Sequence, residues 1–219
     1  MKKRKGLKKF LKVLLALIVI GLIIYACFSV KTKSIFIYNN TFLSDQEIID
    51  RTSLKDYPSF FLTTGSKIKD ELNEPFIKDV KIKRAFLLEL HVEIEEYRPL
   101  FIRQENNTIV LENKVEIPNN YEISLPILIN YVPSTKYDKF IEELAKIDKS
   151  ITDKISEIKY DPNDYDEDRF LLYMNDKNAV YITLTKMDLL NKYNELITKI
   201  DGNEGILYLD SGNYFEVKD

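Results

Sequence analysis

Few residues in this 219-residue chain carry side chains that catalysis or metal binding usually needs. The chain has one histidine, His91, and one cysteine, Cys27. A catalytic triad would need His91, but nothing in the sequence selects a nucleophile to accompany it. One histidine and one cysteine are also too few nitrogen and sulfur ligands for a zinc site. We therefore expect neither nucleophilic catalysis nor a zinc centre.

Two short patterns resemble functional motifs but lack the rest of them. Ser66 and Lys69 have Ser-x-x-Lys spacing, yet neither Ser-Asp-Asn nor Lys-Thr-Gly accompanies them. Residues 161–168, DPNDYDED, are acidic but lack the alternating acids, the central glycine and the final glutamate of a calcium-binding EF-hand loop. We expect an exposed loop there. The sequence thus predicts no enzyme activity, no metal and no cofactor.

An uncharged apolar run over residues 13–30 dominates the chain. Eighteen helical residues at a rise of ~1.5 Å each reach about 27 Å, enough to cross the hydrocarbon core of a bilayer. Residues 1–12 carry seven basic and no acidic side chains. By the positive-inside rule this tail is cytoplasmic, so residues 31–219 lie outside the membrane.

The apolar run has two other interpretations. A cleaved signal peptide needs small residues at its cleavage site, whereas Lys-Thr-Lys follows this run. Ala26 before Cys27 resembles a lipoprotein signal, but Tyr25 is bulky for one. If Cys27 were acylated, the chain would be an extracytoplasmic lipoprotein or binding module. The favoured interpretation makes Cys27 an apolar side chain in a membrane-spanning helix.

The charge distribution restricts what the outer part can bind. All 35 acidic residues follow the span, so the ectodomain is acidic although the formal net charge of the whole chain is only −3. An acidic ectodomain argues against nucleic acid as a partner, because phosphate binding needs clustered lysine and arginine. Because Cys27 is the one cysteine, the ectodomain has no disulfides and must depend on a packed core. With 14 tyrosines and 12 phenylalanines, such a core can form.

The first part of the ectodomain has a strand-helix-helix-strand-strand pattern. Ser44 and Glu47 form a capping-box pattern that predicts a helix start. A second helix is predicted over about 66–73. Over residues 88–96, LELHVEIEE, apolar and polar residues alternate, which indicates a half-buried strand with His91 solvated on its outer face. The remaining predicted strands are SIFIY over 34–38 and IKDVKIK over 77–83.

This order after a single span resembles the POTRA domain of the FtsQ/DivIB family of bacterial cell-division proteins. The stretches that carry the resemblance are Asn39-Asn40, LSDQEII over 43–49, PFIKDVKIKR over 75–84 and VEIEEYRP over 92–99. The family often has glycine after the first asparagine and proline in the turn after the arginine, where this chain has Asn40 and Ala85-Phe86-Leu87. Both differences fall in turns and leave the predicted fold intact.

The second part resembles the β domain of the same family. Hairpins are predicted over 100–111 and 170–184, with LPIL over 125–128 and residues 155–160 as further strands. Apolar residues spaced at four, three, four and four positions predict one helix over 137–155. We therefore expect an α+β protein with these parts: basic tail 1–12, transmembrane helix 13–30, linker 31–33, POTRA domain 34–99 and a mostly antiparallel C-terminal domain 100–219.

The resemblance also implies a function. Family members are single-pass scaffolds of the division complex at the septum, and FtsL-like and DivIC/FtsB-like coiled-coil proteins add a strand to their β domain. We expect residues 208–217 to form one edge strand, with Leu209, Ser211, Tyr214 and Phe215 as the partner-binding residues. The POTRA sheet edge is expected to contact another division or septal cell-wall synthesis protein.

Overall fold

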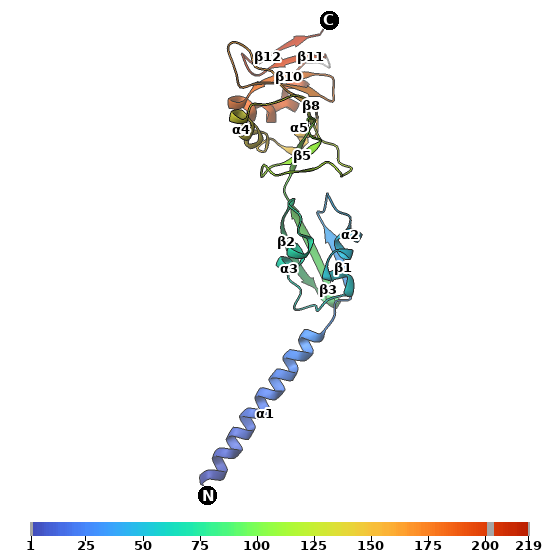
Figure 1. Cartoon of the computed structure of the whole chain (residues 1–219), viewed down its shortest axis with the longest axis vertical. Coiled ribbons are helices and arrows are strands. Elements are labelled where there is room, and N and C mark those ends of the chain that lie inside the picture. The colour runs from blue at the N-terminus through green and yellow to red at the C-terminus, as the bar shows by residue number, and fades with distance from the viewer. Residues whose placement is uncertain (1, 201–203, 219) are drawn as a thin grey trace. The chain divides into compact units, whose positions relative to one another are not determined.

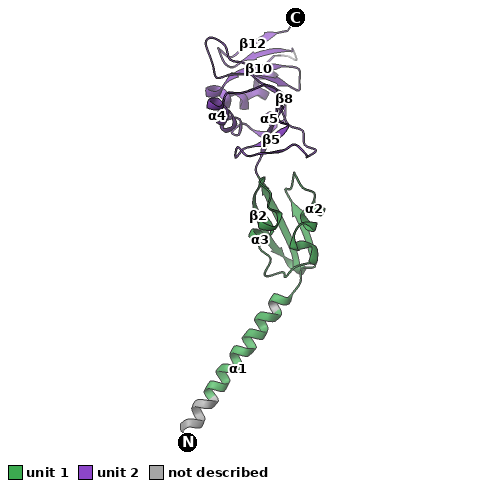
Figure 2. Cartoon of the chain, in the orientation of Figure 1, with its two compact units in different colours: residues 1–96 green, residues 97–219 purple. Residues whose placement is uncertain are grey.

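The computed structural model describes residues 2–200 and 204–218, without the side chains of residues 2–8 and of Cys27. The chain forms two compact units, residues 1–96 and 97–219 (Figure 2). Both units combine helices with strands, which confirms the predicted α+β class. The predicted domain limits of 34–99 and 100–219 stay predictions.

The predicted span is part of one long helix, α1 (Lys2–Ser29). Its most apolar window, Lys9–Ala26, has a mean hydropathy of 2.3 and none of it is buried. A bare apolar helix of this length is costly in water but matches the hydrocarbon thickness of a bilayer. By length and composition, α1 can therefore cross a membrane.

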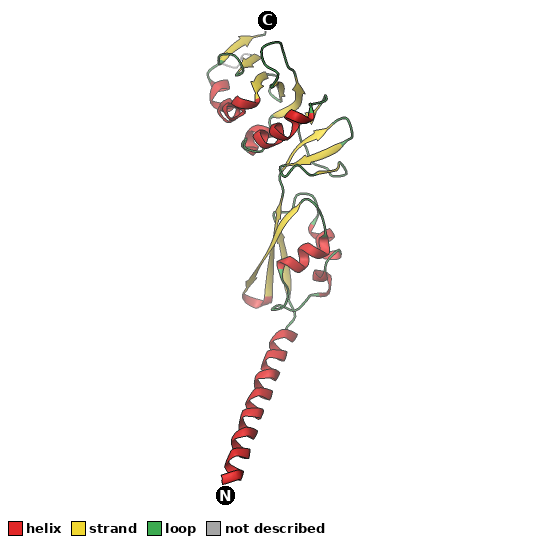
Figure 3. Ribbon diagram, turned by 60° about the vertical axis from the view of Figure 1, so that its left-hand side comes forward, coloured by secondary structure: helices red, strands yellow, loops and turns green. Residues whose placement is uncertain are grey.

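The rest of unit 1 is a three-stranded sheet with helices on one face (Figure 3). The sheet order is β1-β3-β2, with β1 parallel and β2 antiparallel to β3. The elements are β1 (Ser34–Tyr38), α2 (Asp45–Asp50), η1 (Ser53–Asp56), α3 (Gly65–Leu72), β2 (Ile77–Ala85), η2 (Phe86–Leu88) and β3 (Glu89–Glu96), where η marks a 3-10 helix.

Local hydrogen bonds explain why these helices begin and end where they do. The predicted capping box is present: Ser44 accepts from the Glu47 amide, and the Glu47 carboxylate accepts from the Ser44 amide at 2.8 Å. α3 ends at Asn73, whose positive φ of 49° stops the helix. Arg51 donates to the carbonyl oxygen of Leu72 at 3.1 Å, so α2 and α3 are tied together. The core between helices and sheet includes Ile48, Ile68, Leu72, Leu90 and Val92.

The described residues of unit 2 form a nine-stranded mixed sheet in the order β12-β11-β10-β9-β8-β7-β4-β5-β6. Figure 1 labels β5, β8, β10, β11 and β12 of this sheet. The pairs β10–β11, β7–β8 and β4–β7 are parallel, and the other neighbours are antiparallel. The strands are β4 (Pro99–Arg103), β5 (Thr108–Leu111), β6 (Glu116–Pro118), β7 (Ile127–Leu128), β8 (Ile155–Tyr160), β9 (Arg169–Met174), β10 (Ala179–Thr183), β11 (Gly205–Tyr208) and β12 (Tyr214–Val217).

The helices of unit 2 pack on one core with the sheet. They are α4 (Ser134–Leu144), α5 (Lys149–Thr152), η3 (Leu184–Lys192) and α6 (Tyr193–Thr198). Phe140 of α4 stacks on Phe170 of β9 with ring centres 4.6 Å apart, and both rings are buried. Met187 and Tyr193 extend the same core toward β10 and β11. The opposite face of β9–β12 is left without a covering helix in the described residues.

The prediction of one helix over 137–155 is wrong. Every apolar residue of that pattern is buried, but the helix stops after Leu144, resumes as the short α5, and gives way to β8 at Ile155. The cause is Arg98, whose guanidinium donates to the carbonyl oxygens of Leu144, Ala145 and Ile147 at 3.3, 2.5 and 2.7 Å. A distant side chain thus satisfies the carbonyls at the end of α4.

Candidate functional site

The end of the chain forms a β-hairpin, so the prediction of one strand over 208–217 is wrong. β11 ends at Tyr208, and Asp210-Ser211-Gly212-Asn213 turns the chain back into β12. Asn213 has a positive φ of 56°, which asparagine tolerates better than most residues. Because β12 is the outermost strand of the sheet of unit 2, the C-terminus still lies at an edge (Figure 1).

Among the described residues, the backbone of β12 pairs with a strand on one side only, that of β11. The Lys218 amide donates to the Glu204 carbonyl at 2.9 Å. Two and four residues earlier on β12, Glu216 lies opposite Ile206 and Tyr214 lies opposite Tyr208. Hydrogen-bonded and non-hydrogen-bonded pairs alternate in an antiparallel ladder. The N–H and C=O groups of Phe215 and Val217 therefore point away from β11, toward the open edge.

Side chains of β12 divide between the two faces of the sheet. Phe215 lies opposite the buried Leu207 and packs against the core. It fits because its neighbour is Gly205: a Cβ there would lie 2.7 Å from the tip of the Phe215 ring. Tyr214 projects from the other face and is 50% exposed. Val217, at the end of the strand, is 52% exposed.

A row of three tyrosines crosses the uncovered face toward this edge. Tyr181, Tyr208 and Tyr214 are register partners on β10, β11 and β12, and their rings stack at 5.2 and 4.5 Å. The Arg169 guanidinium lies 3.5 Å from the centre of the Tyr181 ring. The Tyr208 hydroxyl donates to Glu216 at 2.8 Å, and this bond raises the pKa of Tyr208 to about 12. We call these three residues the tyrosine row.

Hydrogen bonds to neighbouring elements hold the turn of the hairpin in place. The Asp210 carboxylate accepts from Arg169 at 2.9 Å, and its carbonyl accepts from Lys186 at 2.5 Å. The Leu209 amide donates to the Tyr181 carbonyl at 2.9 Å, and the Leu209 side chain is only 1% exposed. These contacts fix β12 in position at the edge of the sheet.

The predicted partner-binding residues thus occupy different environments. Leu209 is in the core, Phe215 is half-buried against it, and Ser211 and Tyr214 are exposed. Partner binding by these four stays a prediction. Sequence reasoning missed Val217 and the tyrosine row. The alternation of side chains along β12 could have indicated Val217 as a further residue of the edge strand. The tyrosine row depends on the pairing of β11 with β10, which is distant in sequence.

The residues considered for catalysis lie on different elements, His91 on β3 and both Ser66 and Lys69 on α3. His91 was expected to be solvated, yet it is half-buried beside Phe36 and Tyr38, with ring centres 5.2 and 5.6 Å away. Lys69 donates to the Lys78 carbonyl at 2.6 Å. Among the described residues, no group of three or more histidine, cysteine, aspartate or glutamate side chains could hold a metal ion.

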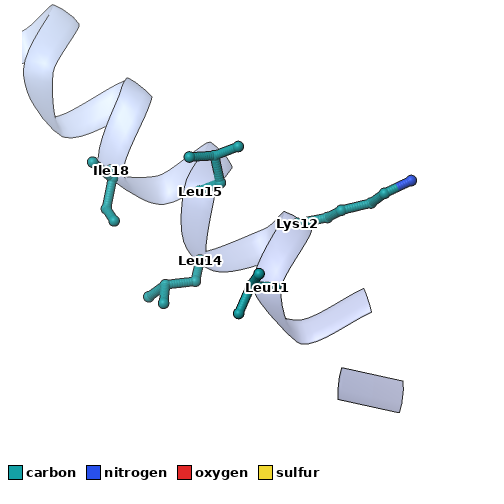
Figure 4. Close-up of a pocket in the computed structure, with 5 residues that line it drawn as sticks. All are labelled: Leu11, Lys12, Leu14, Leu15 and Ile18. Carbon is teal, nitrogen blue, oxygen red and sulfur yellow. The ribbon is translucent and has the colours of Figure 1, made fainter. Parts of the chain in front are cut away.

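One apolar hollow lies on α1. Figure 4 shows its lining residues, which project from a single helix and enclose no space between elements. They are Leu11, Lys12, Leu14, Leu15 and Ile18. The hollow is therefore the surface of an unaccompanied apolar helix. The question of acylation concerns the Cys27 side chain, which lies outside the part of the chain that the structure describes.

Comparisons with known proteins point to cell division. The family model "POTRA domain, FtsQ-type" matches residues 30–97. The chain is 27% identical to cell division protein DivIB of Bacillus subtilis (strain 168), over 98% of this chain and 86% of the relative. It is 28% identical to DivIB of Bacillus anthracis, over 92% and 79%. A solved extracytoplasmic domain of DivIB from Geobacillus stearothermophilus is 24% identical, covers 49% of this chain and 96% of that one, and has a TM-score of 0.41.

Proposed function

Because this chain belongs to the FtsQ/DivIB family of bacterial cell-division proteins, as its sequence predicted, we propose that it is a non-catalytic scaffold of the division complex. One helix anchors it, and both folded units lie outside the cytoplasm at the division septum. The scaffold binds FtsL-like and DivIC/FtsB-like subunits by accepting a strand from them along β12.

The free edge of β12 is the observation that supports this proposal. An exposed edge offers unpaired N–H and C=O groups, and a partner strand supplies the matching acceptors and donors. The outward backbone groups of Phe215 and Val217 have the spacing of one antiparallel ladder step. A partner strand laid beside β12 would form the tenth strand of the sheet.

The four predicted residues take different roles in this proposal. Tyr214 contacts the partner through its side chain, because large exposed aromatic residues bury area at little cost in entropy. Phe215 contributes its outward backbone groups, while its ring keeps β12 on the core. Leu209 positions the hairpin, and Ser211 lies at the exposed turn beside the new strand. Val217 joins them as a contact residue.

A second edge serves a second partner in this proposal. β1 is an outer strand of the sheet of unit 1, and Phe36 and Tyr38 on it are each 42% exposed. We assign this edge to another division or septal cell-wall synthesis protein.

A proline exchange at Val217 tests strand addition directly. Val217→Pro removes the outward N–H while leaving the β11–β12 ladder bonds of Tyr214, Glu216 and Lys218 available. Capture of FtsL-like and DivIC/FtsB-like subunits by the full-length protein should fall about tenfold or more. Val217→Ala, which keeps the N–H, is the matched control and should lose much less.

The same variants are then followed in dividing cells as fluorescent fusions. The unmodified protein should form a band at mid-cell, and Val217→Pro should weaken recruitment of its partners to that band. Undiminished capture by Val217→Pro, with β12 intact by hydrogen exchange, would refute strand addition at this edge. A uniform peripheral signal from the unmodified fusion would count against the division role itself.

A further inference from the structure

Two loops of unit 1 expose large apolar side chains at the same end of the domain. One loop, residues 58–63, carries Phe61 and Leu62, which are 45% and 54% exposed. The other is η2, with Phe86 at 86% and Leu87 at 58% exposed. We call Phe61, Leu62, Phe86 and Leu87 the apolar platform. Single exposed apolar residues are ordinary, but four gathered on two adjoining loops mark an interaction surface.

The first loop is hydrogen-bonded to the residues at which α1 ends. The Ser59 hydroxyl donates to the Phe28 carbonyl at 2.6 Å, and the Phe60 amide donates to the Val30 carbonyl at 2.9 Å. The Thr32 amide donates to the Pro58 carbonyl at 3.0 Å. This loop therefore stays within hydrogen-bonding distance of the end of the helix, whatever direction the helix takes.

The second loop is tied to the first through one arginine. Arg84 of β2, two residues before η2, donates to the carbonyls of Phe60, Phe61 and Thr63 at 2.7, 3.1 and 2.6 Å. The Lys33 amide also donates to the Leu88 carbonyl at 3.0 Å. In Figure 3, η2 lies at the end of the sheet of unit 1 where the chain arrives from α1. The two loops thus form one surface beside the exit of the span.

The backbone of η2 is held in a costly conformation that keeps its side chains outward. Leu87 and Leu88 both have φ of 64°, in the left-handed region that leucine rarely adopts. Such a conformation persists where the surrounding structure imposes it, and it occurs often at functional positions. Here it turns Phe86 and Leu87 away from the core.

From this placement we propose that the apolar platform inserts into the outer interfacial layer of the bilayer that α1 crosses. The uncharged run predicted to span the membrane ends at Val30, and the hydrogen bonds of the loop reach Phe28, Val30 and Thr32, all within two residues of that end. The loop therefore begins at the hydrocarbon edge, next to an interfacial layer roughly 5–8 Å deep. The platform therefore lies at headgroup depth.

Charge around the platform agrees with a lipid partner. Lys31 and Lys33 are exposed beside it, and among the described residues neither has an ion-pair partner. Apolar residues with flanking lysines are typical of segments that lie in a membrane interface. Contact at two places, the span and the platform, would restrict how unit 1 tilts on the membrane. The inference rests on the membrane span and does not depend on partner docking.

Site-specific labels in the full-length protein test this contact. In a Cys27→Ser background, single cysteines at Phe61, Phe86 and Tyr38 receive an environment-sensitive fluorophore, and the protein is reconstituted into lipid vesicles. Tyr38 is the matched control, an exposed aromatic at the far end of β1. Vesicles with nitroxide groups near the headgroup should quench positions 61 and 86 several-fold more than position 38.

Two results would overturn the inference. Equal, weak quenching at positions 61, 86 and 38 would mean that the platform faces water or another protein. Strong quenching at all three would mean that the whole unit lies on the membrane, without a specific platform. A fourth label, at Leu22, checks the span with quenchers deep in the bilayer. If that label is also unquenched, the membrane anchoring in the proposed function fails together with the platform.

Discussion

Tyr208 is the residue that links the exposed face of the hairpin to its outermost strand. Its ring lies between those of Tyr181 and Tyr214, and its hydroxyl donates to Glu216 on β12. Cross-strand aromatic pairs stabilise a sheet by roughly 0.2–1 kcal/mol each. Of these contacts, the hydrogen bond to Glu216 is the one that requires Tyr208 to be protonated.

The protonation of Tyr208 gives a prediction at the residue scale. Its folded pKa of about 12 exceeds the ordinary 10.0, because Glu216 accepts the hydroxyl proton in a hydrogen bond. The stabilisation is fully present below pH 10 and is lost as the pH rises through 12. Glu216→Gln should lower the pKa of Tyr208 toward 10, measured by NMR titration of labelled tyrosine rings.

Glu204→Gln is the control for that titration. Glu204 is a nearby carboxylate that pairs with Lys177, and its removal should leave the pKa of Tyr208 high. An unchanged Tyr208 in Glu216→Gln would mean that the hydrogen bond is not the cause of the shift.

At the scale of elements, local sequence patterns predicted most of unit 1. They failed where residues distant in sequence determine where a helix or strand ends. The Ser44–Glu47 cap and the alternation over 88–96 depend on neighbours in sequence, and both are present. The helix over 137–155 is interrupted because Arg98, far away in sequence, satisfies its carbonyls. Its apolar spacing identified the buried face correctly but could not reveal that cap.

The candidate site was predictable in part for the same reason. The position of the last strand at the chain end indicated an edge near the C-terminus, whereas the hairpin, the burial of Leu209 and the tyrosine row arise from strand pairing. A pairing between β10 and β11, which η3 and α6 separate in sequence, leaves no periodic signal along the chain.

Gly205 provides a prediction at the element scale. A Cβ at this position would lie 2.0 Å from the Glu216 carbonyl oxygen, so Gly205→Ala must push β12 away from β11. We expect faster hydrogen exchange in β12 and weaker capture of the proposed coiled-coil partners, while the helices of the core keep their protection. Because the clash involves backbone, a side-chain rotation cannot relieve it.

Gly212→Ala is the matched control on the same hairpin. Its added Cβ would meet Tyr214 at 3.7 Å, an ordinary contact, so exchange and capture should stay near the unmodified values. If Gly205→Ala bound partners as well as Gly212→Ala does, the position of β12 would not matter for docking.

At the scale of the whole molecule, the proposed docking combines the anchor with the open edge. An added strand of a few residues is a small contact, and small interfaces alone bind weakly. When scaffold and partners are anchored in one membrane, docking is nearly intramolecular, and the effective concentration increases binding without new contacts. This explains how a four-residue edge strand could hold a division subunit.

If the anchor supplies effective concentration and β12 supplies the contact, changes to the anchor have predictable effects. Replacing residues 13–30 with an unrelated apolar span, while keeping the basic tail, should preserve capture of the partners through β12. Secreting residues 31–219 without any span should weaken apparent binding to membrane-embedded partners by about a hundredfold or more. Co-purification from membranes compares the two forms at equal abundance. Binding of the anchor-free form at full strength would show that the edge suffices alone, whereas failure of the exchanged span would show that α1 itself recognises a partner helix.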